Sequence, residues 1–362
     1  MSNSNASGAD RGDDASSPSA STRTAGLRPA TVKDVAKLAG VSPMTVSRTI
    51  AGGQNVRPEI QARVLEAVQE LGYHRNENAR RMRVSKGSGL VGVAITNLAN
   101  PYYASFALGV EEVAAHHGVR IIIGSTGEDT ERERQLVADF LGRQVEGLVL
   151  VPAGGDTKHL QVQALGGTPL VLASRALDGV DADTVLVDDG GGAHAGTTAL
   201  LKAGHRRIAY LGNVASVSTG HRRYAGFCGA LQDYGVPLDR ALVKRGQQDV
   251  EAAQVAMTSL LDLEDPPTAV FCANNRNTIG ALKAIGARIR ERGVREEAPA
   301  IVSFDDFELA ELMPVPVTVI DHDARELGRE SARLLFARMT PDGATAATRE
   351  IEMPTRLIVV RS

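Results

Sequence analysis

One short segment of the chain places hydroxyl groups beside a single cation. Residues 42–49 read Ser-Pro-Met-Thr-Val-Ser-Arg-Thr, and helical spacing turns Val46 and Ile50 toward a core. The opposite side carries short or basic side chains, namely Met44, Thr45, Ser47, Arg48 and Thr49. Hydroxyls and a guanidinium arranged in this way can reach the base edges and phosphates of duplex DNA. Pro43 and Met44 offer no side-chain donor, so we expect their contacts to be apolar, for example with a thymine methyl group.

A second set of polar residues follows strand-like apolar runs later in the chain. Asp305 follows AIVSF, Asn274 follows TAVFCA, and Arg223 opens a helix-like stretch after YLGN. Carboxylates accept hydrogen bonds from hydroxyls, whereas arginine and asparagine supply donors, and this mixture suits a sugar. Ligands of parallel sheets bind at the carboxyl ends of the strands. We therefore expect these three residues to contact one small polar ligand, while Asp306 can simply cap a helix.

Earlier strand-like runs are followed by further candidates for the same ligand. Asn97 comes after GLVGVAIT, and Tyr102 and Tyr103 follow within NPYY, where an aromatic ring can stack on a sugar face. Ser174 ends the run PLVLAS, and two aspartates end TVLVDD. Tyr102 can equally be an ordinary core residue, so both alternatives stay open at this point.

No group of residues supports an enzymatic interpretation of the sequence. The run GGGAHAG at 190–196 lacks the lysine followed by serine or threonine of a phosphate-binding loop, and it does not spell GxGxxG. The histidines are scattered, without metal-ligand spacing or a neighbouring nucleophile. Cys228 and Cys272 lie in apolar surroundings and are expected to be reduced core residues. We therefore expect no catalysis, no metal and no cofactor.

The charge of the chain is unevenly distributed. Residues 27–88 hold 11 Lys and Arg but only 5 Asp and Glu, although the whole chain carries a formal net charge of −3. A basic front on an acidic body suits a polyanion-binding head joined to a body that binds something else, although a solvated charged surface would give the same bias. No apolar run approaches the roughly 18 residues that span a membrane. Residues 1–28 lack the apolar core of a signal peptide, so we expect a disordered tail and a cytoplasmic protein.

Capping residues divide the basic head into three short helices. Thr31 can cap the first, with Asp34 three residues further on, and Gly40 is a natural stop. Ser42 suits the start of the second helix, and a third is expected over about 58–71. Three helices with a glycine in the first turn predict an all-α helix-turn-helix unit, here bounded at about residues 29 and 74, whose second helix enters the major groove. A small structural bundle would show the same periodicity.

The remainder of the chain alternates β-rich runs with helical stretches from Gly89 onward. Nine runs are predicted as strands: GLVGVAIT, VRIIIGST, VEGLVLVP, PLVLAS, TVLVDD, RIAYLGN, TAVFCAN, AIVSFDD and VTVID. Most are continuous runs of Val, Ile and Leu, which are typical of strands covered on both faces. The sequence therefore predicts an α/β body of two doubly wound parallel-sheet subdomains.

The head also carries a specific family motif. TVKDVAKLAGVSPMTVSRTIAG, followed about 20 residues later by LGYHRNENARRMR, closely resembles the N-terminus of the lactose-repressor (LacI/GalR) family of bacterial transcription regulators. The resemblance implies that head and linker bind a pseudopalindromic double-stranded operator. The residues expected to do so are Thr31, Ser42, Pro43, Met44, Thr45, Ser47, Arg48, Tyr73, Asn76, Arg80, Arg81 and Met82. Arg57 stands where a small capping residue is commoner in the family, which leaves the cap of the third helix open.

Residues 75–88 form the expected linker between head and body. An isolated helix of this length cannot offset its nucleation cost, so we expect it to be unfolded alone. The resemblance implies a hinge helix that orders when two copies meet on DNA and inserts an apolar side chain into the minor groove, where Met82 replaces the usual Leu. Arg80, Arg81 and Arg83 would then pair with phosphates. Without the preceding motif, a plain basic linker would explain the segment.

The resemblance covers residues 30–362 and implies a body similar to periplasmic sugar-binding proteins. It implies one subdomain of about 89–188 plus 322–350 and another of about 189–321 plus 351–362. No heptad tail for tetramer formation follows RLIVVRS, so a homodimer is expected.

The residues that the resemblance assigns to an effector are Asn97, Tyr102, Tyr103, Ser174, Arg223, Asn274 and Asp305. Ser174 stands where many relatives carry an acid, and Asn275 takes the place of a common Asp, where either residue can cap the following helix, so Asn275 is expected to be structural. Because Ser174, Asn275 and Arg276 are all substituted positions, the effector class stays open. The expected function is a transcription regulator, most often a repressor, controlled by a small polar effector such as a sugar. The alternatives are a sugar-binding protein without a regulatory role and a nucleotide-dependent enzyme.

Overall fold

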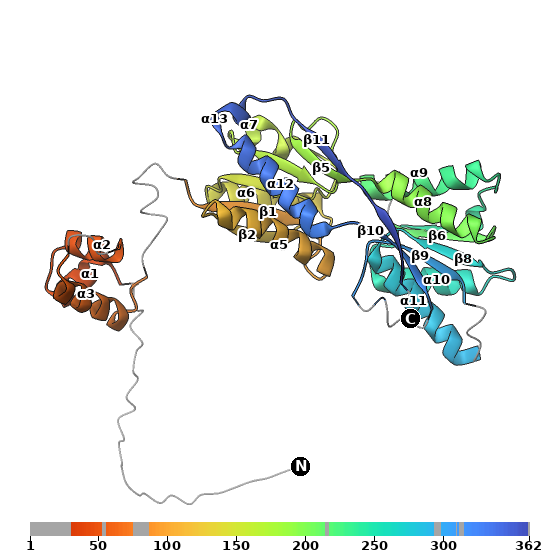
Figure 1. Ribbon diagram of the computed structural model, residues 1–362, viewed down its shortest axis with the longest axis horizontal. Coiled ribbons are helices and arrows are strands. Elements are labelled where there is room, and N and C mark those ends of the chain that lie inside the picture. The colour runs from red at the N-terminus through yellow and green to blue at the C-terminus, as the bar shows by residue number, and fades with distance from the viewer. Residues whose placement is uncertain are drawn as a thin grey trace, which may run out of the picture. The chain divides into compact units, whose positions relative to one another are not determined.

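A computed structural model describes residues 30–52, 56–74, 87–213, 217–292, 298–308, 310 and 315–360. The expected tail and most of the expected hinge segment lie outside these residues. The chain divides between Glu77 and Asn78 into two compact units, a small helical one and a large α/β one (Figure 1).

The small unit consists of helices α1 (Val32–Ala39), α2 (Pro43–Ile50) and α3 (Pro58–Glu70). The predicted capping box is confirmed at the start of α1. The Asp34 backbone N–H donates to the Thr31 hydroxyl, and the Thr31 backbone N–H donates to the Asp34 carboxylate. Gly40 ends α1 in the left-handed conformation, with φ of 64°, which glycine adopts without steric cost. The Ser42 side chain caps α2 as predicted.

Helix α2 buries the expected face and one further residue, Thr49. Val46 is fully buried in the core that α1, α2 and α3 share, as predicted. Thr49, which was expected on the outward side, is buried, so that expectation is wrong. Its hydroxyl donates to the Thr45 carbonyl at 3.0 Å, which satisfies the polar group inside the core. The sequence left open whether Arg57 caps the third helix. In the structure, Arg57 precedes α3 and forms no side-chain capping hydrogen bond.

The large unit contains two sheets of six strands each. The first has the order β11-β5-β4-β3-β1-β2 and the second the order β12-β10-β9-β8-β6-β7, and the crossed order shows the doubly wound topology that was predicted. All strand pairs described are parallel except β10 with β12. The first sheet consists of β1 (Leu90–Ile95), β2 (Arg120–Ser125), β3 (Gly147–Leu150), β4 (Leu170–Ala173), β5 (Asp183–Val187) and β11 (Glu350–Met353). The second consists of β6 (Ile208–Gly212), β7 (Val243–Arg245), β8 (Ala269–Cys272), β9 (Ala300–Phe304), β10 (Val317–Asp321) and β12 (Arg356–Val360).

Helices cover both faces of each sheet, as Figure 1 shows. The first sheet carries α5 (Pro101–His116) and α12 (Ala324–Arg338) on one face and α6 (Thr130–Gly142) on the other, with short α7 (Val162–Leu165) and α13 (Pro341–Ala344) at its margin. The second sheet carries α8 (Asp189–Lys202) and α9 (Ser218–Asp233) on one face and α10 (Val250–Leu261) and α11 (Asn275–Arg292) on the other. This burial on both faces explains the continuous apolar runs of the strands.

The chain crosses between the two sheets three times, and one boundary differs from the expected division. Strand β11 pairs with β5 of the first sheet, whereas the division placed residues 351–362 with the second. The division is therefore wrong for residues 351–353, and the last crossing lies between β11 and β12. The sequence prediction also missed β7, β11 and β12.

Helices α5 and α12 approach each other closely through glycines. A methyl group added at Gly109 would lie 1.9 Å from the Arg325 carbonyl oxygen, and one added at Gly328 would lie 2.1 Å from that of Phe106. Both distances are far below any real contact, so only glycine permits this packing. This contact joins α5 of the first sheet to α12, which follows strand β10 of the second sheet.

Candidate functional site

The predicted DNA-contacting residues of the small unit divide into exposed and structural groups. Pro43, Met44, Ser47 and Arg48 are exposed on α2, and Met44 is 64% exposed. The helix has no acidic residue in its first turn, so a phosphate would meet no repulsion there. This exposed face is therefore suited to contact a polyanion.

Other predicted DNA-contacting residues also hold the fold together. The Thr31 hydroxyl donates to the Asp34 carboxylate at 2.6 Å, and the Ser42 hydroxyl lies 2.9 Å from that of Thr45. Tyr73 is half-buried against the small core. The predicted contacts Asn76, Arg80, Arg81 and Met82 lie outside the described residues.

All seven residues predicted to contact an effector line one cavity between the two sheets of the large unit. Its volume is about 70 Å³, and residues from both subdomains form its wall. The predicted members are Asn97, Tyr102, Tyr103, Ser174, Arg223, Asn274 and Asp305. Because each follows a strand, the carboxyl-end rule brought together side chains that are far apart in the sequence. We call this cavity the cleft.

Arg223 lies at the centre of a buried charge network beside the cleft. Its Nε donates to the Asp189 carboxylate at 2.7 Å, and its Nη1 lies 3.4 Å from the Asp305 carboxylate and 2.6 Å from the Ala273 carbonyl oxygen. The guanidinium also stacks 3.6 Å above the Phe304 ring. Burial opposes the charge, but Asp305 and Asp189 raise the pKa of Arg223 above its ordinary value. Burial also raises the pKa of Asp189, although Arg223 counters it.

Two cleft residues adopt a backbone conformation that is rare for residues with side chains. Ser174 has φ of 64° and Asp305 has φ of 65°, both in the left-handed region. Such residues tend to occur at ligand sites, where the surrounding fold maintains the strain. One carboxylate oxygen of Asp305, Oδ1, is buried and accepts no hydrogen bond. This orphan acceptor could bind a ligand hydroxyl.

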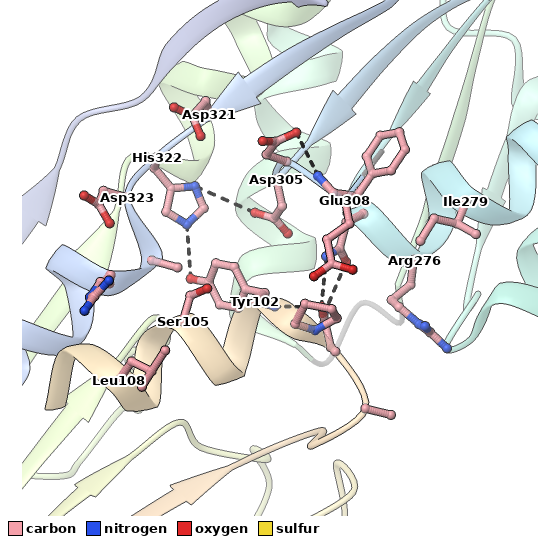
Figure 2. A pocket seen from close by; sticks show the side chains of 18 of the residues that line it. Tyr102, Ser105, Leu108, Arg276, Ile279, Asp305, Glu308, Asp321, His322 and Asp323 are labelled. Carbon is pink, nitrogen blue, oxygen red and sulfur yellow. Dashed lines mark hydrogen bonds and ion pairs between the residues drawn. The ribbon is translucent and has the colours of Figure 1, made fainter. Parts of the chain in front are cut away.

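Tyr102 connects the cleft with a second cavity. Its hydroxyl lies 3.1 Å from His322 Nε2, and His322 Nδ1 lies 3.8 Å from Asp305 Oδ1, as Figure 2 shows. Burial and the Asp305 carboxylate hold the pKa of Tyr102 well above its ordinary value, and burial lowers the pKa of His322. The second cavity has a volume of about 740 Å³ and shares Asn100, Tyr102, Arg276 and Asp305 with the cleft. Tyr102 is therefore a wall residue between the two cavities.

The sequence prediction missed several residues of the cleft. Arg175 donates to both carboxylate oxygens of Glu128, at 2.5 and 2.8 Å, and to the Pro152 carbonyl oxygen. Asn100 also lines the cleft, and it exchanges two hydrogen bonds, at 3.2 and 2.9 Å, with Asn275, which lines the second cavity. Further missed lining residues are Thr96, Asn213, Thr219, Gln248 and Arg276. Applying the carboxyl-end rule one residue beyond Ser174 would have found Arg175.

Two aspartates next to cleft residues in the sequence, Asp188 and Asp306, do not line the cleft. Asp188 accepts from the Gly191 backbone and caps α8, so it does not line the cleft. Asp306 accepts from the Phe307 backbone and lines the second cavity, and its role as a helix cap stays a prediction. Among the described residues, no group of three or more His, Cys, Asp and Glu is arranged to hold a metal ion. Within the same ranges, no helix is both long and apolar enough for a membrane crossing.

Comparison with known proteins agrees with the two-unit organisation. Residues 31–76 match the family described as bacterial regulatory proteins, lacI family, and residues 88–359 match periplasmic binding proteins and sugar binding domain of LacI family. The ribose operon repressor of Haemophilus influenzae is 31% identical over 311 residues, which cover 86% of this chain and 92% of that relative. The chain belongs to the LacI family of bacterial regulatory proteins.

Further relatives cover nearly the whole LacI-family chain. The maltose regulon regulatory protein MalI of Escherichia coli strain K12 is 32% identical over 339 residues, which cover 91% of this chain and 98% of MalI. Among solved structures, the transcriptional regulator CelR in complex with cellobiose is 30% identical with a TM-score of 0.66, covering 92% of this chain and 100% of that one. The predicted family, fold class and general function, a DNA-binding transcription regulator, are confirmed.

Proposed function

We propose that this LacI-family regulator is a dimeric repressor that binds a pseudopalindromic operator and is controlled by a small sugar or sugar derivative. One observation carries the proposal: the same chain has an exposed face of α2 without acidic residues and a polar cleft lined by residues of both subdomains. The relatives named as ribose operon and maltose regulon regulators, and the cellobiose complex of CelR, agree with a sugar effector.

The DNA contacts follow from the chemistry of the exposed face of α2. Arg48 presents a guanidinium fork to a guanine or to phosphates, and Ser47 presents a hydroxyl. Pro43 and Met44 supply apolar surface at the start of the helix, next to the Ser42 cap. Two copies of the head would read two half-sites, and the predicted hinge residues Arg80, Arg81 and Met82 would contact the minor groove between them.

The effector would join the two subdomains across the cleft. Asp305 accepts ligand hydroxyls, Asn97 and Asn274 offer donors and acceptors, and Tyr102 and Tyr103 supply ring faces. A ligand that binds one arrangement of the subdomains better than another shifts their equilibrium by its difference in affinity. That shift changes the spacing of the two hinge segments in a dimer and thereby changes operator affinity.

DNA selection tests the proposal directly. Full-length protein is used to enrich duplexes from a random pool, and binding is then measured by fluorescence anisotropy. We expect inverted repeats to be enriched and the affinity to fall steeply with salt. Arg48→Ala should remove most of the preference for the enriched duplex over a scrambled one, by about tenfold or more. Arg120→Ala, which removes an exposed cation of the large unit, serves as the control. Equal binding of scrambled and enriched duplexes by the unaltered protein would refute the proposal.

A further inference from the structure

Three arginines line the cleft, and two of them are already neutralised by the protein. Arg175 is held by both carboxylate oxygens of Glu128. Arg223 is held between Asp189 and Asp305. Arg175 is balanced by one carboxylate, whereas Arg223 faces two carboxylates and leaves one negative charge in excess at its end of the cleft. Neither guanidinium therefore has positive charge left to attract an anion.

Arg276 is the exception among the three. It lines the cleft near the start of α11, and it forms no ion pair within the ranges that the structure describes. Its Nε is buried and has no hydrogen-bond partner. Figure 2 shows its side chain pointing away from Asp305 and His322, so the carboxylate of the cleft does not neutralise it. One uncompensated cation thus stands at the cleft wall.

The helices around Arg276 add to this positive end. Residues in the first turns of α5, α9 and α11 all line the cleft, among them Tyr102, Thr219 and Arg276 itself. Helix N-termini carry partial positive charge and unpaired backbone N–H groups. Helix α9 has no side-chain cap at Val217, so its first N–H groups are left without that partner. Both contributions favour an anion in the same cavity as Arg276.

Asp305 gives the cleft a second, opposite requirement. Its Oδ1 is buried without a donor, and its Oδ2 faces Arg223. A hydroxyl group satisfies such an acceptor, whereas an anionic group would be repelled. The cleft is therefore complementary to a ligand that carries hydroxyls at one end and a negative charge at the other.

We propose that the effector is a polyhydroxy compound that carries an anionic group, a phosphate or a carboxylate, and that Arg276 selects for that group. The inference rests on the proposed function, because it specifies the chemistry of the effector. The planar guanidinium can donate two parallel hydrogen bonds to a carboxylate or phosphate, which a lysine cannot reproduce. Arg276 is thus a specificity-determining residue, and the neutral parent sugar would leave it without a partner.

Matched pairs of ligands test this by isothermal titration calorimetry on the full-length protein. The probes are ribose against ribose 5-phosphate, and glucose against glucose 6-phosphate and gluconate, with inorganic phosphate alone as a further probe. We expect at least one anionic member to bind tenfold or more tightly than its neutral parent, since charge-assisted bonds are about that strong. The phosphate and carboxylate arms show which anion is preferred.

Two variants assign the selectivity to one residue. Arg276→Gln should reduce the preference for the anionic member, measured as the ratio of the two affinities, about tenfold. Arg288→Gln is the matched control, because Arg288 lies on the same helix, pairs with Asp262 and does not line the cleft. Arg276→Lys keeps the positive charge but lacks the planar guanidinium. Its preference for the anionic ligand should lie between that of the unaltered protein and that of Arg276→Gln.

The outcomes separate the inference from the proposed function. Neutral sugars that bind as tightly as their anionic partners would overturn the inference and leave a sugar effector standing. An unchanged preference in Arg276→Gln would overturn the role of Arg276. Inorganic phosphate that binds as tightly as a sugar phosphate would overturn the requirement for hydroxyls. If neither neutral nor anionic probes bind at all, the sugar effector itself is contradicted and the inference falls with it.

Discussion

Replacing Arg223 by methionine should destabilise the large unit strongly, because it removes the guanidinium that holds two buried carboxylates. Asp189 is fully buried, and Asp305 is 8% exposed. Methionine keeps most of the side-chain volume, so the change tests charge rather than packing. Among the residues that the structure describes, the other ion-pair partner of these carboxylates is His322, at 3.8 Å from Asp305.

The expected size follows from the burial of the network. Breaking a buried ion pair by removing one partner costs about 3–5 kcal/mol, because a buried charge is left uncompensated. The neighbouring Arg222 pairs with Glu352 at the surface, with side chains 31% and 49% exposed. An exposed pair of that kind contributes less than about 1 kcal/mol. Arg223→Met and Arg222→Met therefore form a matched pair that differs mainly in burial.

Thermal unfolding of the full-length protein measures the difference. We expect Arg223→Met to lower the unfolding temperature of the large unit by roughly 5–15 °C and Arg222→Met by a few degrees at most. Adding Asp189→Asn and Asp305→Asn to Arg223→Met should recover much of the loss, because the uncompensated charges disappear. Equal effects of the two arginine variants would refute the view that charge compensation holds this site together.

The same variant should respond to pH in a defined direction. Burial already raises the pKa of Asp189 in the native protein. Without Arg223, the folded-state pKa of Asp189 rises further above its unfolded value, so protonation favours the folded state. The loss of stability in Arg223→Met should therefore be larger at pH 8 than at pH 5. A loss that is the same at both pH values would contradict this assignment.

Three further changes follow from the structure. Asn275→Ala removes both amide hydrogen bonds between the subdomains and should destabilise the large unit by about 2 kcal/mol, measured as a lower unfolding temperature; no change would show that the pair contributes nothing. Gly328→Ala forces a methyl group onto the Phe106 carbonyl and should destabilise by about 1–3 kcal/mol in urea unfolding, whereas Gly142→Ala, which meets nothing within 4 Å, should not. Arg48→Ala should weaken operator binding about tenfold without altering the unfolding of either unit.

The first unit was predictable because its decisive interactions are local. Thr31 and Asp34 are three residues apart, and Gly40 and Ser42 act on the chain next to them. The error at Thr49 has a physical reason, since a residue three positions after Val46 faces the same side of a helix. The hydroxyl made Thr49 look like a surface residue, but its bond to the Thr45 carbonyl lets it be buried.

The strands were predictable where burial on both faces gives continuous apolar runs. Strand β7 is three residues long at a sheet edge, and β11 alternates exposed and half-buried residues, so neither shows such a run. Strand β12 is apolar, but it pairs antiparallel at the opposite edge of its sheet, which the pattern of parallel units does not indicate. The boundary error at residues 351–353 follows from missing β11.

The candidate cleft was predicted where one rule applies and missed where partners are distant. All seven predicted effector residues follow strands and line the same cavity. The Arg175 and Glu128 pair joins residues 47 positions apart, and Asn100 and Asn275 are 175 apart. Nothing local indicates such partners. Their discovery needed the strand order of the two sheets, which places these loops together.

The coupling between the cleft and the DNA-binding head is tested most directly by operator affinity with and without a bound effector. Full-length protein is titrated into its selected duplex at fixed salt, in the presence of a sugar derivative that binds in calorimetry. The affinity should change by roughly 5–150-fold, the usual range of coupling between two sites, and the change should disappear in Asp305→Asn. An operator affinity that stays the same at saturating ligand would contradict control of DNA binding by the cleft.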